Sequence, residues 1–326
     1  QGGGDFPRPA YPAKRVAANG FLAEWRLTAD LLPQQVPDSH FAEEYKTMLA
    51  HDAVSLTVLW SAVLPQPPAA PPVQWGELLL LPTTTGLQAL SLADGSPRWH
   101  FALEGAFPSG VNGAGNRALL AASSTDPRGT QGALVALDHA GQVRWRWEPG
   151  LRQVSAAAVQ EQRVTVTALG NDASMFVSLA LADGQEQHRS ALPHTPARNA
   201  PTIVGDLALI PCTGPQLLAV ELAGDLRWRV ELPGEAWFDR SPCVAGETVI
   251  TVSSTGAVLA LRLADGARLW QREVGPAGKP LSAPATDGER VFVGARDGLY
   301  ALRLRDGDLA WHFPTGRRIE AAPALA

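Results

Sequence analysis

Residues 299–316 read LYALRLRDGDLAWHFPTG, in which apolar and polar residues alternate on both sides of an Asp-Gly pair. This pattern predicts a β-hairpin, because the two-residue turn needs positive φ angles, which glycine adopts without steric cost. Related stretches return about every forty residues, a period typical of repeat folds. They read LQALSLADGSPRWHFALEG (87–105), LVALDHAGQVRWRWEPG (134–150), LLAVELAGDLRWRVELPG (217–234) and VLALRLADGARLWQREVG (258–275), with a degenerate copy, VSLALADGQEQHRSALPH, at 177–194.

A tryptophan recurs four residues after the glycine of the turn. His188 holds this place in the degenerate copy, and Trp60, 39 residues before Trp99, marks one more unit, which makes seven. We expect these side chains to wedge between neighbouring units, where a buried tryptophan removes about 200 Å² of surface from water. The predicted structural tryptophans are Trp60, Trp99, Trp145, Trp228, Trp270 and Trp311.

Each unit is expected to hold four strands, of which the last two are the hairpin. A proline recurs in the first strand and, since proline cannot donate to a ladder, this strand should lie at a sheet edge beside the centre of the fold. The second strand is the most apolar, as expected for a strand buried between neighbouring units. The recurring prolines are Pro72, Pro201, Pro242, Pro284 and Pro323.

The two ends of the chain are predicted to complete one sheet together. Residues 14–30 align with residues 289–308 and so supply strands two to four, whereas residues 317–326 match only a first strand. The sequence therefore predicts an all-β fold: a single seven-bladed β-propeller of four-stranded blades, spanning residues 1–326 as one domain and closed by a composite N-/C-terminal blade. Eight blades are the alternative, if residues 31–57 hold further strands.

Residues 31–57 are interpreted as an insertion within the composite blade. Phe41, Tyr45, Met48 and Leu49 follow a candidate N-cap, Ser39, at helical spacing, which predicts a short amphipathic helix. A helix packed on the side of the propeller is one interpretation, and a partner-docking arm is the other. Residues 1–10 are expected to form a flexible N-terminal segment.

Composition and charge exclude several functional classes. The net charge of −5 and a pI of about 5.8 argue against general nucleic-acid binding, which needs a basic surface. The longest apolar runs hold only a few residues, so no transmembrane segment is predicted. The opening QGGGDFPRPAYP has neither the basic n-region nor the apolar h-region of a signal peptide. We expect a monomer.

No catalytic or metal-binding pattern is found in the sequence. Cys212 and Cys243 lack the C-x-x-C spacing of zinc or redox sites, and two buried thiols are expected. The seven histidines are scattered in no ligand spacing, and G-x-S-x-G, P-loop and H-E-x-x-H motifs do not occur. We therefore predict no catalytic residue and no metal site.

The hairpin motif resembles the repeat of the pyrroloquinoline-quinone (PQQ) family of β-propellers, A-x-D-x-x-T-G-x-x-x-W. The resemblance covers essentially residues 11–326, although the family's aspartate and threonine are mostly replaced, so the chain looks like a diverged member. Three copies keep the family's spacing, and they run from Ala89 to Trp99, from Ala260 to Trp270 and from Ala301 to Trp311. The copies that begin at Ala136 and Ala219 are one residue shorter.

The PQQ-repeat family includes quinone-dependent dehydrogenases, a scaffold lipoprotein of outer-membrane assembly and, in related propellers, sensors of receptor kinases. The calcium ligands and adjacent cysteines of the dehydrogenases have no match in this sequence. The resemblance therefore implies a non-enzymatic protein- or ligand-binding scaffold or sensor of the bacterial cell envelope, periplasmic or extracytoplasmic, without a cofactor. The alternative is a PQQ-dependent dehydrogenase-like protein or a PQQ-binding sensor, with PQQ and calcium as its cofactors.

The loops that join one blade's fourth strand to the next blade's first strand should surround one mouth of the channel. They carry aromatic and basic side chains, and a ring of arginines there could gather an acidic ligand or a peptide carboxylate. The competing interpretation pairs these arginines with neighbours such as Asp239 and Glu320. The candidate binding-surface residues are Arg152, Arg198, Trp237, Phe238, Asp239, Arg240, Lys279, Arg317 and Arg318.

Overall fold

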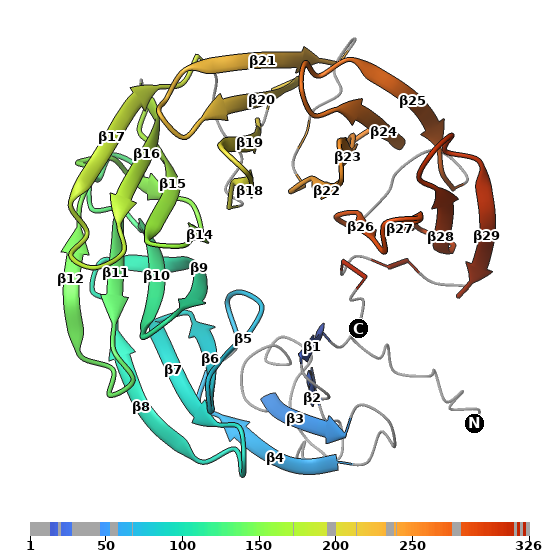
Figure 1. Ribbon diagram of the computed structural model, residues 1–326. Coiled ribbons are helices and arrows are strands. Elements are labelled where there is room, and N and C mark those ends of the chain that lie inside the picture. Colours follow the sequence, from blue (N-terminus) through green and yellow to red (C-terminus); the bar gives the residue numbers. More distant parts are fainter. Residues whose placement is uncertain are drawn as a thin grey trace, which may run out of the picture.

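The computed structural model shows antiparallel β-sheets arranged around a common centre (Figure 1). The described residues contain no helix, so the predicted all-β propeller of four-stranded blades is confirmed. Within a sheet the strands follow one another from the centre outward, as in other propellers. The described residues are 14–18, 21–27, 46–52, 58–66, 68–171, 173–193, 200–212, 214–232, 238, 240–275, 282–315, 318–319 and 322–323, of which 14–18, 21–27, 46–52 and 58 are described by their backbone alone.

These residues form seven sheets, which we number in chain order. The first sheet holds β1 (Lys14–Ala18), β2 (Phe21–Leu27), β3 (Lys46–Asp52) and β4 (Val58–Leu64). The second holds β5 (Val73–Trp75), β6 (Leu78–Thr83), β7 (Gly86–Ser91) and β8 (Pro97–Ala102). The third holds β9 (Ala106–Ala114), β10 (Arg117–Ser124), β11 (Ala133–Leu137) and β12 (Val143–Trp147).

In the fourth sheet two short segments share the innermost place, because both pair with β15. This sheet holds β13 (Gln153–Val154), β14 (Ala158–Gln160), β15 (Arg163–Leu169), β16 (Ser174–Ala180) and β17 (Glu186–Ala191). The fifth holds β18 (Thr202–Val204), β19 (Leu207–Pro211), β20 (Gln216–Glu221) and β21 (Leu226–Glu231). The sixth holds β22 (Cys243–Ala245), β23 (Thr248–Val252), β24 (Ala257–Arg262) and β25 (Arg268–Glu273), and the seventh β26 (Ala285–Thr286), β27 (Arg290–Gly294), β28 (Gly298–Arg303) and β29 (Leu309–Pro314).

The first sheet shows that the predicted composite blade is wrong. It takes all four strands from residues 14–64, with β1 at its inner edge, so residues 14–18 form a first strand and not a second one. The missed element is β3, which pairs with β2 on one side and with β4 on the other. Ala50 of β3 lies opposite Trp60, as Ala89 lies opposite Trp99 in the second sheet. Residues 46–52 are therefore the third strand and not part of an insertion.

The helix predicted around the same residues is also wrong where the structure describes them. Met48 and Leu49 lie in β3, whereas Phe41 and Tyr45 fall outside the described residues. Pairing along both edges of β3 overrides the local helical spacing of a few apolar residues. At the other end, the described residues 318–319 and 322–323 lie in no strand, and the Ile319 N–H donates to the carbonyl of Ala295 in the seventh sheet at 2.9 Å.

The second and third strands of the sheets form the core. Every residue of β6 and β7 is buried, and so is every residue of β19. The pairing of the third and fourth strands contains a β-bulge, whose extra residue lies in the fourth strand directly before the tryptophan, for example Arg98 in the second sheet and Leu269 in the sixth. This bulge adds twist and turns the tryptophan of the fourth strand toward the next sheet.

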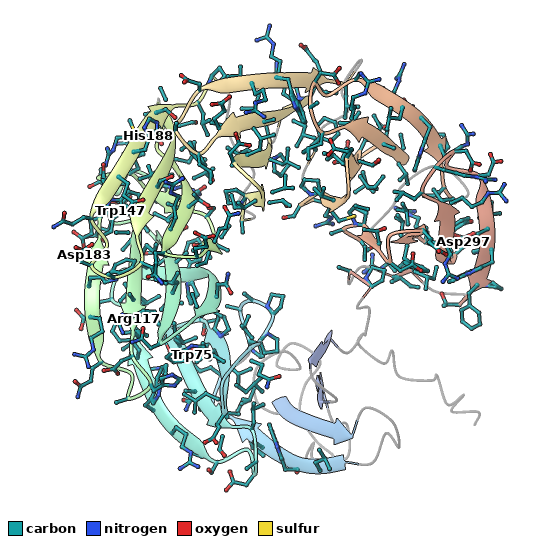
Figure 2. All side chains as sticks on the ribbon, in the orientation of Figure 1. Trp75, Arg117, Trp147, Asp183, His188 and Asp297 are labelled. Carbon is teal, nitrogen blue, oxygen red and sulfur yellow. The ribbon has the colours of Figure 1, made fainter. Side chains whose placement is uncertain are left out.

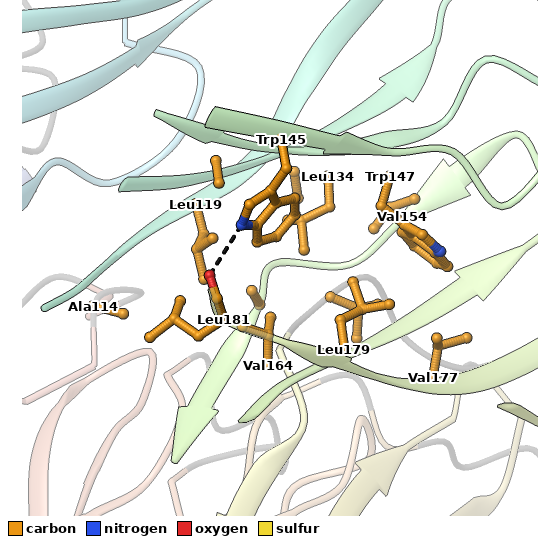
Figure 3. Close-up of a cluster of buried hydrophobic side chains, with 14 of the residues drawn as sticks. Ala114, Leu119, Leu134, Trp145, Trp147, Val154, Val164, Val177, Leu179 and Leu181 are labelled. Carbon is orange, nitrogen blue, oxygen red and sulfur yellow. Dashed lines mark hydrogen bonds between the residues drawn. The ribbon is translucent and has the colours of Figure 1, made fainter. Parts of the chain in front are cut away.

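The tryptophans hold neighbouring sheets together, as the sequence predicts. The indole N–H of Trp145 donates to the carbonyl of Leu181 in the next sheet at 2.9 Å (Figure 3). Its ring lies on Gly184, where an added Cβ would approach the ring to 2.6 Å. Only glycine fits there, because the position combines a φ of +72° with a ring in direct contact. We call this contact a tryptophan–glycine seam.

The same seam recurs four more times around the array. The indole N–H donors bond next-sheet carbonyls at 2.7–2.8 Å, in the pairs Trp60–Leu92, Trp99–His139, Trp228–Leu263 and Trp270–Leu304. The glycines beneath these rings are Gly95, Gly141, Gly266 and Gly307. In the degenerate copy His188 lies on Gly224, and the Ser178 hydroxyl donates to the carbonyl of Leu222 at 3.5 Å in place of an indole.

Trp311 of the seventh sheet departs from this pattern. Its side chain is 38% exposed, whereas Trp60, Trp145, Trp228 and Trp270 are 7–8% exposed. Within the described part of the chain, no carbonyl accepts a hydrogen bond from its indole N–H and no glycine lies beneath its ring. Five of the six tryptophans therefore lie between neighbouring sheets, whereas Trp311 makes no such contact with the described residues.

Candidate functional site

Two sets of loops define the face on which the binding-surface candidates lie. Because the second and fourth strands of an antiparallel sheet run the same way, the blade-joining loops and the loops after the second strands emerge at one face, which we call the rim face. Arg152 and Arg240 lie in blade-joining segments of this face, and Arg318 lies in the segment that follows β29. Arg198, Trp237, Asp239, Lys279 and Arg317 fall outside the described residues, so their placement stays a prediction.

Phe238 is not a surface residue, contrary to the sequence prediction. Its side chain is fully buried and belongs to the apolar cluster between the fifth and sixth sheets, which includes Trp228 and Leu259. Transfer of the phenyl ring from water into this apolar cluster is favourable. The loop therefore folds inward, and the ring completes the core between the two sheets. Phe238 therefore stabilises the fold and cannot contact a partner.

Arg152 has a structural role at the rim face. Its Nη1 donates to the carbonyl of Pro127 at 3.3 Å, and its own carbonyl accepts the N–H of Ser124 at 2.8 Å. These bonds tie a blade-joining loop to the loop after β10. Arg152 and Arg240 are half-buried and Arg318 is exposed, so the three arginines differ in how much of the guanidinium a ligand could reach.

Side chains of the inner strands fix neighbouring sheets to one another near the rim. Ser109 donates to the carbonyl of Val154 at 2.6 Å, and Asn112 donates to that of Ala157 at 3.1 Å. Further along, the Thr202 hydroxyl donates to the carbonyl of Pro242 at 2.9 Å. Such cross-sheet bonds fix the innermost strands of neighbouring sheets, and the loops next to them, relative to one another.

A titratable cluster that the sequence interpretation missed lies at the rim side of the seventh sheet. Oδ2 of Asp297, a residue labelled in Figure 2, accepts a hydrogen bond from the Tyr300 hydroxyl at 2.8 Å, and His312 Nε2 lies 3.6 Å from the same oxygen. The Tyr300 and His312 rings stack with centroids 4.2 Å apart. Burial, and then the bond to Asp297, raises the pKa of Tyr300 to about 12. The hairpin register, which places Tyr300 opposite His312, is the signal that could have found this pair.

A groove of about 840 Å³ lies at the opposite face, between the sixth and seventh sheets. Its walls include Arg290, Arg303 and Arg305, beside the apolar side chains of Leu269 and Leu304. Each of these arginines pairs with an aspartate of its own sheet: Arg290 with Asp287, Arg303 with Asp306 and Asp308, and Arg305 with Asp306.

Asp308 also links the two sheets that form this groove. Arg272 of the sixth sheet approaches its carboxylate to 3.2 Å, and the hydrogen bonds from Arg272 and Arg303 lower the pKa of Asp308. The groove is thus lined by a network in which arginine and aspartate charges compensate each other. A single exposed ion pair of this kind adds little stability, but the network as a whole fixes the side chains that line the groove between the two sheets.

The side chains that could bind a metal ion or react as nucleophiles are scattered among the described residues. No group of three or more His, Cys, Asp or Glu side chains among them is arranged to hold a metal ion. Cys212 and Cys243 are free thiols, and burial raises the pKa of each to about 12, which keeps them in the unreactive thiol form. Within the described part of the chain no helix is long and apolar enough to cross a membrane.

Several solved structures share this fold. BamB from Moraxella catarrhalis superposes with a TM-score of 0.67 at 17% identity, covering 86% of this chain and 86% of that one. A quinohemoprotein alcohol dehydrogenase from Comamonas testosteroni superposes with a TM-score of 0.68 at 12% identity, covering 95% of this chain and 68% of the enzyme. A europium-containing methanol dehydrogenase gives a TM-score of 0.69 at 10% identity, covering 97% of this chain and 81% of that one. At such identities these similarities show the fold alone.

The sequence comparison is more specific. No curated protein is significantly similar to the chain. The profile of one family, described as outer membrane protein assembly factor BamB, matches residues 33–148 and 83–312, which together span most of the chain. The hairpin repeats and five tryptophan–glycine seams lie within this matched region. The chain therefore belongs to the PQQ-repeat β-propeller family described as outer membrane protein assembly factor BamB.

Proposed function

We propose that this protein is a non-enzymatic scaffold of the bacterial cell envelope that binds a protein partner through its rim face. The observation that carries the proposal is the match of the BamB family profile over residues 33–312. The same family membership supports a periplasmic or extracytoplasmic location as part of the proposal. In this role the propeller serves as a rigid platform, and the loops that it displays bind the partner.

The chemistry of the rim supports protein binding. Backbone and side-chain bonds between sheets preorganise the blade-joining loops, as in the pairs Ser109–Val154 and Thr202–Pro242. Arg318 is exposed in the segment that follows β29, and the sequence places Trp237 in a blade-joining loop. Arginine and tryptophan are the residue types most enriched in binding hot spots, so a partner with acidic groups and an apolar anchor fits best.

Site-specific photocrosslinking in a bacterial host tests the proposal. A photoreactive phenylalanine derivative at Arg318 should form an adduct with an envelope protein, identified by mass spectrometry. The matched control carries the same group at Arg144, which lies on the outer strand of the third sheet with 52% of its side chain exposed. Adducts at both positions alike would show that the rim has no special role.

The enzymatic alternative predicts a different result. Purified protein supplied with PQQ and calcium would then reduce an artificial electron acceptor in the presence of an alcohol or an aldose. Such turnover would replace the scaffold proposal with a dehydrogenase. Binding of PQQ without turnover would instead indicate a sensor.

A further inference from the structure

The groove between the sixth and seventh sheets has walls that suit an anionic group. All nine residues that line it are described, and three of them are arginines: Arg290, Arg303 and Arg305. The aspartates that pair with these arginines are not among the lining residues, so the wall presents guanidinium groups. In the lining, three positive charges stand against one negative charge, that of Glu289. We call the space that these residues line the arginine groove.

Two of the arginines face each other across neighbouring strands. Arg290 of β27 lies directly opposite Arg303 of β28, and like charges in this arrangement are destabilising. At the same place the fifth sheet pairs Leu207 with Glu221, so the repeat does not require two arginines here. A local arrangement that costs stability and that the fold does not need is typical of a functional site.

The aspartates beside these arginines serve the turns in which they lie. Asp306 accepts the backbone N–H of Asp308 at 3.0 Å. In the fourth sheet Asp183 accepts the N–H of Gln185 in the same way, at 3.0 Å, and no arginine of the described chain pairs with it. The turn therefore needs its aspartate but not an arginine. The arginines of the groove have another purpose.

The arginines keep hydrogen-bond donors that the protein itself does not use. Arg303 donates through Nε to Asp306 and through Nη2 to Asp308, and Arg305 donates through Nε to Asp306. Among the described residues, no acceptor is bonded to Nη1 of Arg290 or Arg303, or to either Nη atom of Arg305. Guanidinium N–H groups bind carboxylates and phosphates, often through two bonds at once. The groove therefore has the donors for such an anion.

The other walls of the groove favour a peptide over a phosphate. Leu269, Leu304 and Ala310 form an apolar side, and Leu269 is 47% exposed. The carboxylate of Glu289 and the hydroxyl of Thr248 bond no group in the described part of the chain, so both are available as acceptors. An acidic peptide brings carboxylates, apolar side chains and backbone N–H groups together. A phosphate brings no apolar group, and the carboxylate of Glu289 repels it.

We propose that the arginine groove binds a short acidic segment of a partner protein, with carboxylates on Arg303 and Arg305 and an apolar side chain on Leu269. The volume of the groove, about 840 Å³, is within the range of ligand pockets. This inference goes beyond the proposed function, because the groove lies at the face opposite the rim. The two can fail separately: loss of peptide binding would leave crosslinks at Arg318 unchanged, and absence of those crosslinks would leave peptide binding unchanged.

Fluorescence polarisation with the full chain tests the proposal. The probe is a fluorescein-labelled peptide of sequence Glu-Leu-Asp-Leu-Glu, and the control peptide is Gln-Leu-Asn-Leu-Gln, which has the same size and apolar side chains without the charges. We expect saturable binding of the acidic peptide alone. Equal binding of the two peptides, or binding of neither, would overturn the proposal.

Arg305→Gln shows whether the peptide binds in the groove. The variant should weaken binding about tenfold, because it removes charge-assisted hydrogen bonds to a carboxylate. The side chain of Arg305 is 78% exposed, so the melting temperature should not change. The matched control is Arg144→Gln, which removes an exposed arginine paired with Asp138, the turn aspartate of the third sheet, and should leave the affinity unchanged. Equal affinities in the two variants would overturn the assignment to the groove.

Leu269→Gln separates a peptide from a bare anion. It should weaken binding of the acidic peptide several-fold, because the apolar side chain of the peptide loses its contact. Leu226→Gln on the fifth sheet, where the leucine is 45% exposed, should have no effect. Inorganic pyrophosphate is the competing ligand. If it binds more tightly than the peptide, or if Leu269→Gln leaves the peptide affinity unchanged, the groove is an anion site and the peptide proposal is wrong.

Discussion

The indole N–H of Trp270 donates to the carbonyl of Leu304 in the next sheet, 2.8 Å away, while the ring of Trp270 lies on Gly307 of the same turn. A hydrogen bond and a direct contact thus act at one place. Because the ring is 7% exposed, truncation would leave both a cavity and an unsatisfied carbonyl.

Trp270→Ala should therefore lower the free energy of unfolding by about 3–5 kcal/mol. Trp311→Ala should lower it by only about 1 kcal/mol, since that ring is part-exposed and its indole bonds no carbonyl of the described residues. Urea denaturation of the two variants measures the difference. Equal losses would mean that Trp311 is covered in solution as its counterparts are.

Comparison of Gly266→Ala with Gly246→Ala separates the cost of backbone strain from the cost of steric contact with a tryptophan ring. The φ of Gly266 is +72° and a Cβ would lie 2.7 Å from the Trp228 ring, whereas Gly246 has a φ of +55° and no atom within 4 Å of an added Cβ. Gly246→Ala should cost about 1 kcal/mol from the backbone alone, and Gly266→Ala about 3 kcal/mol because the ring must also move. Thermal denaturation compares them, and similar costs would contradict the seam geometry.

Tyr300 should make stability fall at high pH. Its folded pKa is raised to about 12 from a reference value of 10.0, so the neutral phenol stabilises the fold fully below pH 10, and this contribution is lost as the pH rises from 10 to 12. Tyr300→Phe should remove this loss. Absorbance titration at 295 nm should show one tyrosine ionising near pH 12 in the unaltered protein.

Asp297→Asn tests the cause of that shift. Burial is the larger cause and the hydrogen bond to Asp297 the second, so the variant should lower the pKa of Tyr300 without returning it to 10.0. A full return would show that the carboxylate, and not burial, controls the phenol.

Substitution of two adjacent residues of one blade-joining loop should affect different properties, the stability of the fold for Phe238 and the affinity for a partner for Trp237. Phe238 is fully buried, so Phe238→Ala should cost about 3–5 kcal/mol of stability. Trp237→Ala should weaken partner binding by about 2 kcal/mol and leave the melting temperature nearly unchanged, if Trp237 is the anchor that the sequence predicts. Calorimetry for stability and titration with the crosslinked partner for affinity give the two readouts. Intact binding in Trp237→Ala would place the partner surface elsewhere.

Local sequence was sufficient to predict the hairpins and the recurring tryptophans, but not the glycine of the next sheet on which each ring lies. The four-residue interval between glycine and tryptophan, as from Gly266 to Trp270, specifies both the turn and the ring that reaches the next sheet. The third strand of the first sheet could also have been predicted, because Ala50 precedes Trp60 by ten residues, as Ala89 precedes Trp99. It was missed because the turn between them lacks the glycine that marks the other copies.

The candidate site was less predictable, for physical reasons. Whether Phe238 points into the core depends on the path of its loop across a seam, which residues far away in the sequence determine. The exposure of Trp311 depends on which part of the chain lies next to the last sheet in space, and the local sequence around Trp311 does not specify this. The Tyr300–His312 stack depends on cross-strand register, which sequence alone could have supplied.

The tryptophan–glycine seams all have the same polarity along the chain, with the tryptophan in one sheet and the glycine in the next. Five sheets hold the next one with a tryptophan that lies on its turn glycine, and the fourth sheet does so with His188, so a unit duplicated or deleted among them would find matching neighbours on both sides. The number of blades is therefore open to change by gene duplication. The first unit differs from the others in sequence, because Leu56 stands four residues before Trp60, where the other units have a glycine.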